Sequence, residues 1–227
     1  MFYSLDCIKK VAAQTNNVIL FHSANGKDSI ALLDMCYPYF KKIVCVYMYM
    51  VKDLDHINAY ISWAKAKYPT IEFMQVPHYV LSQYIRDGYM GITPDRTQRV
   101  YQLKNIVEMT KKNTGIAWAI FGFKQSDSMN RRLMLRSYAD EHICEPTKNA
   151  YPLSKYKNKD VLAYIKHRKL IQPTKYGNGQ SQGNDVTNLP FLMYCRWNYP
   201  NDYKKIIAVF PDAERIVFEY ENSLKNE

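Results

Sequence analysis

A short apolar run that passes directly into a small polar loop sets the fold expected of this chain. Residues 18–21 are Val, Ile, Leu and Phe, and residues 23–29 are mostly small and polar. From Lys27 onward, apolar residues recur at helical spacing until Pro38. An apolar run of this kind is typical of a parallel strand buried on both faces. The pattern therefore predicts a strand at residues 17–21 and a helix from Lys27.

The same alternation of strands and helices continues along the chain. Further strands are predicted at residues 43–50, 71–76 and 117–123, and helices at 54–67, 80–86, 99–112, 157–169 and 203–224, the last with a break at Pro211. This order indicates an α/β fold with a doubly wound, mostly parallel sheet and helices on both faces. We expect residues 1–176 to form the nucleotide-binding domain. Residues 177–227 should form a loop and helical extension packed on the same domain.

Composition limits the class of protein. The 227 residues are 47% hydrophobic, enough for one core, and no run of about eighteen apolar residues could span a membrane. The N-terminus lacks the basic-then-apolar layout of a signal peptide, so a cytoplasmic protein is expected. The five cysteines are odd in number and form no CxxC pair, which argues against a disulfide framework and against a zinc or iron–sulfur site.

Two loops are the candidates for a ligand site. Parallel sheets bind ligands at the carboxyl ends of their strands, and this rule selects residues 23–29 and residues 124–132. The formal charge of +10 indicates an anionic partner, either a nucleotide or a nucleic acid, with a solvated basic surface as the alternative.

The first loop has the chemistry of a phosphate cradle. Its small residues let backbone N–H groups converge, the following helix presents its positive end, and Lys27 adds a cation. The Ser23 and Ser29 hydroxyls can donate to phosphate oxygens. An ordinary helix cap is the alternative, but a cap does not need Gly-Lys-Asp-Ser together. The phosphate-binding residues expected here are Ser23, Ala24, Asn25, Gly26, Lys27, Asp28 and Ser29.

This loop departs from the Walker A motif, because Phe21 stands where that motif has glycine and Asp28 follows Lys27. It resembles instead the PP-loop, SxGGKDS, of the adenine nucleotide α-hydrolase-like superfamily, which includes ATP pyrophosphatases and the phosphoadenylyl-sulfate (PAPS) reductases. Asn25 replaces the first glycine of that motif. Asn tolerates left-handed backbone angles better than other non-glycine residues, so we expect the turn to be kept.

A second segment, residues 122–132, resembles the GxRxx(D/E)SxxR segment of the PAPS-reductase-like family, with Lys124 in place of the first Arg. It offers cations and a serine hydroxyl beside the first loop, which suits a second phosphate or sulfate group. A solvated helix face is the alternative. The binding residues expected here are Lys124, Ser128, Arg131 and Arg132, and the resemblance implies Lys27 and Arg131 as the catalytic residues.

A third segment, residues 151–176, is similar to the family pattern PLxxWxxxDVxxYIxxxxL, with Tyr156 at the Trp position. The resemblance fails at the cysteines. PAPS reductases carry a nucleophilic thiol in a C-terminal ECGxH segment, whereas no cysteine follows Cys195 in this chain. Cys195 lies in an apolar stretch, which indicates a core thiol.

Relatives that bind an iron–sulfur cluster have a segment like SxGCxxC. The matching residues here are 181–187, with Asn184 and Thr187 at the cysteine positions. The comparison implies no iron–sulfur cluster, and the spacing of the five histidines suggests no metal site.

The leading functional hypothesis is an enzyme that cleaves ATP between its α and β phosphates to give AMP and pyrophosphate. Lys27 and Arg131 would stabilise charge on the leaving group. The alternatives are a sulfonucleotide reductase or sulfur-transfer component that takes its thiol from a partner, a nucleotide- or nucleic-acid-binding module without turnover, and a structural protein. The implied ligand is ATP or PAPS, with Mg²⁺ expected for ATP. The acceptor, a nucleic acid or a protein, and the oligomeric state stay open.

Overall fold

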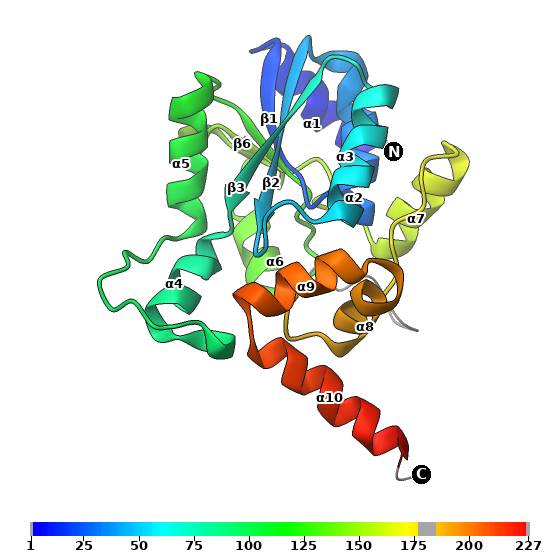
Figure 1. Cartoon of the computed structure of the whole chain (residues 1–227). Helices are drawn as coiled ribbons and strands as arrows, with labels where there is room; N and C mark the ends of the chain where they lie inside the picture. Colours follow the sequence, from blue (N-terminus) through cyan, green and yellow to red (C-terminus); the bar gives the residue numbers. More distant parts are fainter. Residues whose placement is uncertain (1, 177–184, 226–227) are drawn as a thin grey trace. The chain divides into compact units, whose positions relative to one another are not determined.

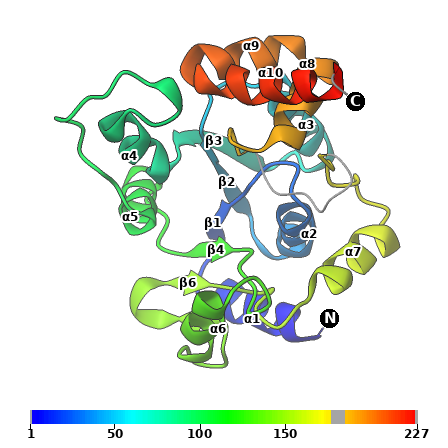
Figure 2. The same ribbon diagram turned by 90° about the horizontal axis from the view of Figure 1, so that it is seen from below.

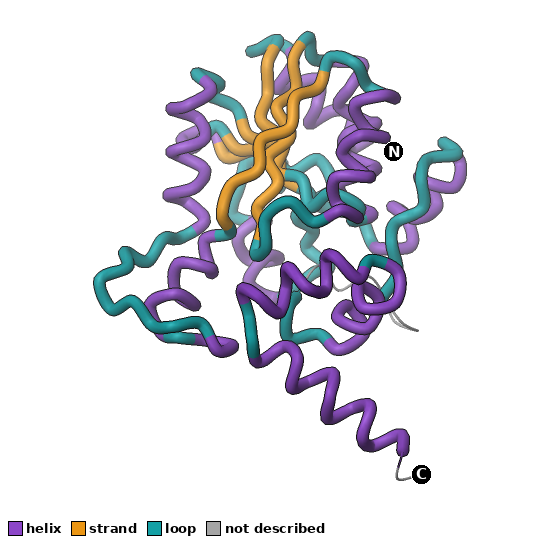
Figure 3. Tube along the Cα trace, viewed as in Figure 1, coloured by secondary structure: helices purple, strands orange, loops and turns teal. Residues whose placement is uncertain are grey.

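One mixed sheet organises the structure, a computed structural model that describes residues 2–176 and 185–225. Its strands are β1 (Asn17–Phe21), β2 (Lys42–Tyr49), β3 (Ile71–Pro77), β4 (Ala119–Phe121), β5 (Ile143–Cys144) and β6 (Asn149–Ala150), which lie in the order β3-β2-β1-β4-β6-β5. β1 pairs in parallel with β2 and β4, β4 pairs in parallel with β6, and β5 is antiparallel to β6. Figure 3 shows the strands, in orange, with helices beside them. The predicted mostly parallel sheet is confirmed.

Helices accompany the strands in the alternating order that the sequence predicts. They are α1 (Phe2–Ala12), α2 (Lys27–Cys36), α3 (Asp55–Lys67), α4 (Tyr79–Asp87), α5 (Leu103–Thr114), α6 (Met129–Arg136), α7 (Asn158–His167), α8 (Leu189–Asn198), α9 (Pro200–Val209) and α10 (Asp212–Lys225), with 3₁₀ turns η1 (Tyr37–Tyr39), η2 (Tyr89–Gly91) and η3 (Glu145–Thr147). Figures 1 and 2 show α2 on one face of the sheet and α5 on the other. None of the helices in the described residues is long and apolar enough to cross a membrane.

The strand order shows that the sheet is doubly wound. From β1 the chain adds β2 and then β3 toward one edge, and it then returns to place β4 on the other side of β1. The order therefore reverses between β1 and β4, which is the topological switch point of such sheets. Val18, Ile19 and Leu20 of β1 are fully buried, as their apolar run predicted.

Contacts along the chain divide it into two units. Unit 1 comprises Met1–Tyr47, Ile61–Met74 and Val107–Pro173, and unit 2 comprises Met48–Tyr60, Gln75–Ile106 and Thr174–Glu227. Unit 1 contains both loops that the sequence selected. The sequence placed a boundary at residue 176. The packing of the C-terminal extension on the same domain stays a prediction.

Candidate functional site

The loops that follow β1 and β4 begin next to each other. The last residues of these parallel strands, Phe21 and Phe121, are register partners. Their rings are stacked, with centroids 4.7 Å apart and planes 8° apart. Because both loops leave the same edge of the sheet at the switch point, they lie where α/β sheets bind ligands. A Cβ atom at Gly122 would lie 3.2 Å from the Cβ of Asp28, so the second loop passes close to the start of α2.

The first loop turns on Ala24, not on Asn25. Ala24 has a left-handed backbone angle, φ = 52°, whereas Asn25 has no positive φ. The expectation that Asn25 keeps the turn by adopting left-handed backbone angles is therefore wrong. Because residue 25 does not need a positive φ, asparagine can replace glycine there. Gly26 is needed for a different reason. It is the N-cap residue of α2 in extended conformation, and a Cβ atom there would lie 2.6 Å from the Ser23 hydroxyl oxygen.

Two serines close the first loop onto α2. The Ser29 hydroxyl oxygen accepts a hydrogen bond from the Ser23 backbone N–H at 2.8 Å, and the two hydroxyl oxygens are 2.9 Å apart. One of the two hydroxyl protons is used in the bond between them, and the other is left for an external oxygen acceptor. The serines thus hold the loop in shape and still offer one donor.

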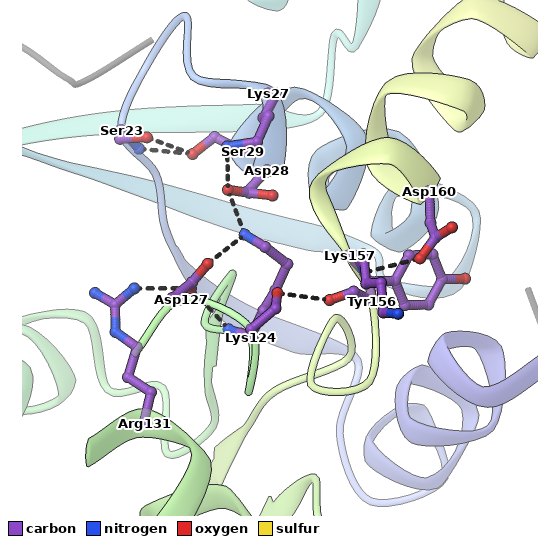
Figure 4. Close-up of polar contacts among 11 residues, drawn as sticks. Ser23, Lys27, Asp28, Ser29, Lys124, Asp127, Arg131, Tyr156, Lys157 and Asp160 are labelled. Atoms are coloured by element: carbon purple, nitrogen blue, oxygen red, sulfur yellow. Dashed lines mark hydrogen bonds and ion pairs between the residues drawn. The ribbon is translucent and has the colours of Figure 1, made fainter. Parts of the chain in front are cut away.

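A chain of ion pairs joins the two loops (Figure 4). Lys27 Nζ lies 3.2 Å from Asp28 Oδ2, which also lies 2.7 Å from Lys124 Nζ. Lys124 Nζ in turn lies 3.0 Å from Asp127 Oδ1, and Asp127 Oδ2 accepts a hydrogen bond from Arg131 Nη1 at 2.8 Å. Three cations therefore alternate with two carboxylates, and the chain carries one net positive charge. This arrangement fixes the two loops to each other.

Lys124 is the interior member of this chain. Its side chain is only 1% exposed, and its ammonium group contacts the carboxylates of Asp28 and Asp127. Its backbone N–H also donates to Asp127 Oδ2 at 2.9 Å. The free-energy cost of burying this ammonium group is offset only while both carboxylates stay in place. The structure thus brings Lys124 to the first loop, as expected, but directs its charge toward carboxylates of the protein.

Asp127 is held in its ionised form. Burial raises the pKa of the Asp127 carboxyl, but hydrogen bonds from Lys124 and Arg131 outweigh burial and the pKa is lowered. Asp127 stands at the Asp or Glu position of the GxRxx(D/E)SxxR pattern, and no role was predicted for it from the sequence. Its signal was the placement of an acid between two basic residues, three positions after Lys124 and four before Arg131.

Lys27 and Arg131 are the solvent-accessible ends of the ion-pair chain. The Lys27 side chain is 18% exposed and that of Arg131 is 41% exposed. Arg131 is also held from its own loop, because its guanidinium lies 4.1 Å from the centre of the Phe123 ring. Burial lowers the pKa of His22, the residue before the first loop, to about 3, so this imidazole is neutral near pH 7. The positive charge at the site therefore comes from the two ends of the ion-pair chain.

The remaining residues of the second loop have structural contacts. Ser128 is the N-cap of α6, and its hydroxyl oxygen accepts a hydrogen bond from the Arg131 backbone N–H at 3.2 Å. Arg132 is exposed, and its Nε donates to the Gln125 carbonyl oxygen at 3.4 Å. Binding of phosphate by these two residues stays a prediction. The third segment lies beside this loop, because Ser126 Oγ donates to the carbonyl oxygen of Tyr156 at 3.0 Å (Figure 4).

Cys195 lies in the core of unit 2 and is fully buried. Burial raises the pKa of its thiol to about 12. A thiolate, not a thiol, is the nucleophile in sulfur chemistry, so this cysteine is poorly suited to attack a substrate.

The doubly wound sheet with a phosphate-cradle loop at its switch point defines a PP-loop α/β protein. The chain matches the family model of the phosphoadenosine phosphosulfate reductase domain over residues 18–182. This match covers more than half of the chain, and the protein belongs to that family. The resemblance inferred from the loop motifs is thereby confirmed. No curated protein matches the sequence significantly.

Two solved structures illustrate the fold. The U34-tRNA thiolase NcsA from Methanococcus maripaludis, solved with its [4Fe-4S] cluster, is 15% identical with a TM-score of 0.47, and the alignment covers 94% of this chain and 77% of that one. The NH3-dependent NAD synthetase from Campylobacter jejuni is 13% identical with a TM-score of 0.46, covering 100% and 95%. At these identities the similarity concerns the fold alone.

One of these structures corrects the cofactor expectation. ATP or PAPS, with Mg²⁺ for ATP, and no iron–sulfur cluster were expected from the sequence, yet a protein of similar fold holds a [4Fe-4S] cluster. The expectation that no cluster is bound is therefore not kept. Asn184 lies outside the described residues, within which no group of three His, Cys, Asp or Glu could hold a metal. We assign no chemical step to a cluster.

Proposed function

We propose that this chain binds the phosphate groups of an adenine nucleotide between its two loops and cleaves ATP into AMP and pyrophosphate. The observation that carries this proposal is the ion-pair chain from Lys27 to Arg131. It neutralises its own interior and leaves one cation at each end, on two different loops. A ligand with several phosphate groups can contact both ends at once, whereas a single small anion cannot use both as well.

The chemistry needs charge stabilisation more than proton transfer. Water attacks the α phosphorus, and the bond from that phosphorus to the α–β bridging oxygen breaks; with an acceptor hydroxyl in place of water, the AMP group would stay attached to the acceptor. The electron pair of that bond leaves with pyrophosphate, and the proton of the nucleophile passes to solvent. Lys27 and Arg131, together with backbone N–H groups at the start of α2, support the charge that develops on the leaving group.

The reductase alternative draws its thiol from a partner, because four of the five cysteines, Cys144 excepted, are buried. Burial raises the pKa of the Cys7 and Cys45 thiols, as it does that of Cys195. Free sulfite formed from PAPS with a thioredoxin-like reductant would support this alternative. Nucleotide bound and recovered intact would support a module without turnover.

The direct test is to incubate the purified protein with ATP or with PAPS, with and without magnesium chloride, and to identify the products by mass spectrometry. AMP and pyrophosphate in equal amounts are expected from ATP. The product should disappear in Lys27→Ala and persist in Lys41→Ala, which removes an exposed lysine of unit 1 outside both loops. Equal rates of ATP cleavage in Lys27→Ala and Lys41→Ala would contradict the proposed site.

Arg131→Lys separates binding from catalysis. A lysine keeps the charge but loses the planar fork, so it cannot contact Asp127 and a phosphate oxygen in the same geometry. We expect the turnover number to fall by about tenfold or more with a smaller change in ATP affinity, measured by steady-state kinetics and calorimetry. Equal losses in both quantities would make Arg131 a binding residue only.

A further inference from the structure

The excess positive charge of this protein belongs to one unit. Unit 1 contains 20 Lys and Arg residues against 10 Asp and Glu residues, whereas unit 2 contains 11 of each. The whole net charge of +10 is therefore carried by unit 1, which also contains the candidate site. A solvated basic surface would be expected to distribute this excess over both units. Its confinement to unit 1 indicates a local, anionic partner.

Part of this charge forms a strip beside the second loop, made of Arg132, Arg136 and Lys157. The Nε atoms of both arginines donate to Gln125, from Arg132 to the carbonyl oxygen at 3.4 Å and from Arg136 to Oε1 at 3.3 Å. Lys157 follows Tyr156, whose carbonyl oxygen is bonded to Ser126 (Figure 4). All three cations are exposed, and none makes an ion pair within the described part of the chain.

Two members of the strip, Arg132 and Lys157, lie at helix starts, where helix electrostatics disfavour cations, whereas Arg136 lies in the last turn of α6. α6 has no acidic residue in its first turn, and Arg131 and Arg132 occupy that turn. Lys157 is the N-cap of α7, and Lys159 follows in its first turn. Positive side chains at the positive ends of helices are unfavourable in isolation. Asp127 pairs with Arg131, and Asp160 lies in the first turn of α7, so Arg132 is the cation at these helix starts that points to an external anion, because local rules are broken mainly at functional sites.

The strip is longer than one phosphate group. Arg132 and Arg136 are four residues apart on α6, which is roughly 6 Å along the helix axis, and Lys157 lies on another segment. Met129 and Leu133, one turn apart on the same helix, are 62% and 63% exposed. A partner with regularly spaced phosphates and flat apolar groups between them matches both features. Nucleic acid strands have this chemistry, and only unpaired strands expose the faces of their bases.

We propose that the strip of Arg132, Arg136 and Lys157, with the exposed Met129 and Leu133, binds a single-stranded nucleic acid. The phosphates contact the cations and the bases cover the apolar side chains. This surface begins next to Arg131, so the strand lies beside the nucleotide site. The inference does not depend on ATP cleavage, because it rests on the strip and on the division of charge.

The test measures binding of a fluorescent strand of about 20 nucleotides, as RNA and as DNA, by anisotropy between about 50 and 200 mM salt. Arg136→Glu/Lys157→Glu should weaken binding at least tenfold. It should also make the salt dependence shallower by about 1.4 in logarithmic slope, because two phosphate contacts are lost. Arg136→Gln/Lys157→Gln should show the same direction with a smaller loss. Circular dichroism verifies that the variants are folded.

The matched control is Lys65→Glu/Lys112→Glu, which changes the charge of unit 1 equally at exposed positions on α3 and α5. It should bind within about twofold of the unmodified protein. The proposal would be overturned if strand binding fell equally in Arg136→Glu/Lys157→Glu and in Lys65→Glu/Lys112→Glu, or if no strand bound at low salt. It would also be overturned if a double-stranded form of the same sequence bound more tightly than the single strand, or if polyglutamate bound equally well. ATP affinity, measured separately by calorimetry, should be the same in all of these proteins. Absence of ATP binding in all of these proteins would contradict the proposed function and would leave the proposal for the strip unchanged.

Discussion

Lys27 ends the ion-pair chain on the side of the first loop, and its removal tests the site most directly. In Lys27→Ala, Asp28 keeps its contact with Lys124, so the two loops should stay joined. The loss is then a charge-assisted hydrogen bond to phosphate, and ATP binding should weaken by about 1–3 kcal/mol. Calorimetry on Lys27→Ala and on the exposed control Lys41→Ala measures the difference. Unchanged affinity in a folded Lys27→Ala protein would remove the phosphate-cradle interpretation.

Gly26 tests the close packing of the first loop. In Gly26→Ala the new Cβ would meet the Ser23 hydroxyl oxygen at 2.6 Å and displace it from Ser29. We expect ATP affinity to fall by about tenfold, because the loop loses one of its two closing hydrogen bonds. The double variant Ser23→Ala/Gly26→Ala removes the clashing oxygen and should recover the free energy of unfolding lost in Gly26→Ala. A double variant less stable than Gly26→Ala would show that the requirement for glycine has another cause.

At single residues, sequence reasoning finds the type of chemistry but not the partner of each charge. Gly26, Lys27 and Arg131 lie where the motifs indicate. The burial of Lys124 was not predictable from its own neighbours, because one of its two carboxylate partners, Asp28, lies on another loop. The turn at Ala24 was missed for a related reason. Alanine rarely has positive φ, so the residue type at position 24 does not indicate a left-handed turn.

Among the elements, α2 connects the candidate site to the rest of unit 1. Asp34, near its C-terminal end, is buried and accepts hydrogen bonds from Tyr68 and Tyr164 at 2.9 and 2.6 Å. Arg168, next to the end of α7, donates to the same carboxylate at 2.9 Å. Burial raises the pKa of Asp34, but these three hydrogen bonds outweigh burial and the pKa is lowered. The carboxylate thus ties α2 to α7.

This tie predicts a dependence of stability on pH. Because the pKa of Asp34 is lowered by folding, its contribution is present above the carboxyl pKa of the unfolded chain, about 3.9, and is lost as the pH falls through the folded-state value. Asp34→Asn should lower the free energy of unfolding by about 1–3 kcal/mol at pH 7, and the difference from the unmodified protein should shrink in acid. Urea unfolding at several pH values measures this, with the exposed Asp6→Asn as control. A difference that is constant with pH would exclude the charge of Asp34 as its cause.

Elements with a strong local pattern were predicted well, and elements that depend on distant partners were not. β1 was predicted with its observed bounds, and α2 begins at Lys27 as expected. β5 and β6 have two residues each, too few to show a period, and β6 joins the sheet by pairing with β4, which lies far earlier in the sequence. α1 did have a signal, because the buried residues at 4, 7, 8 and 11 follow helical spacing. The tail forms α8, α9 and α10, and a proline lies at or next to the first residue of each helix.

At the scale of the whole molecule, each unit is built from three separate segments of the chain. The chain passes between unit 1 and unit 2 five times, so neither unit is one continuous segment. Within unit 2, Asp202 on α9 accepts hydrogen bonds from the backbone N–H groups of Asp55 and His56, the first residues of α3. Its carboxylate also lies 2.6 Å from His56 Nδ1, and both side chains are buried. Residues 146 positions apart in the sequence thus form one core.

This long-range core makes the predicted boundary at residue 176 testable. A chain that ends at Tyr176 keeps His56 but loses its partner Asp202. It also keeps Tyr84 but loses Phe210, whose ring centroid lies 6.3 Å from that of Tyr84. We expect the shortened chain to lose at least about 3–5 kcal/mol in free energy of unfolding and to bind a hydrophobic dye, because buried polar and aromatic groups are left without partners. Asp202→Asn in the full chain should lose about 1–3 kcal/mol, since the helix start keeps a weaker acceptor. If residues 1–176 instead unfold with the stability of the full chain, they are an independent domain, and the contacts of unit 2 contribute little to its energetics.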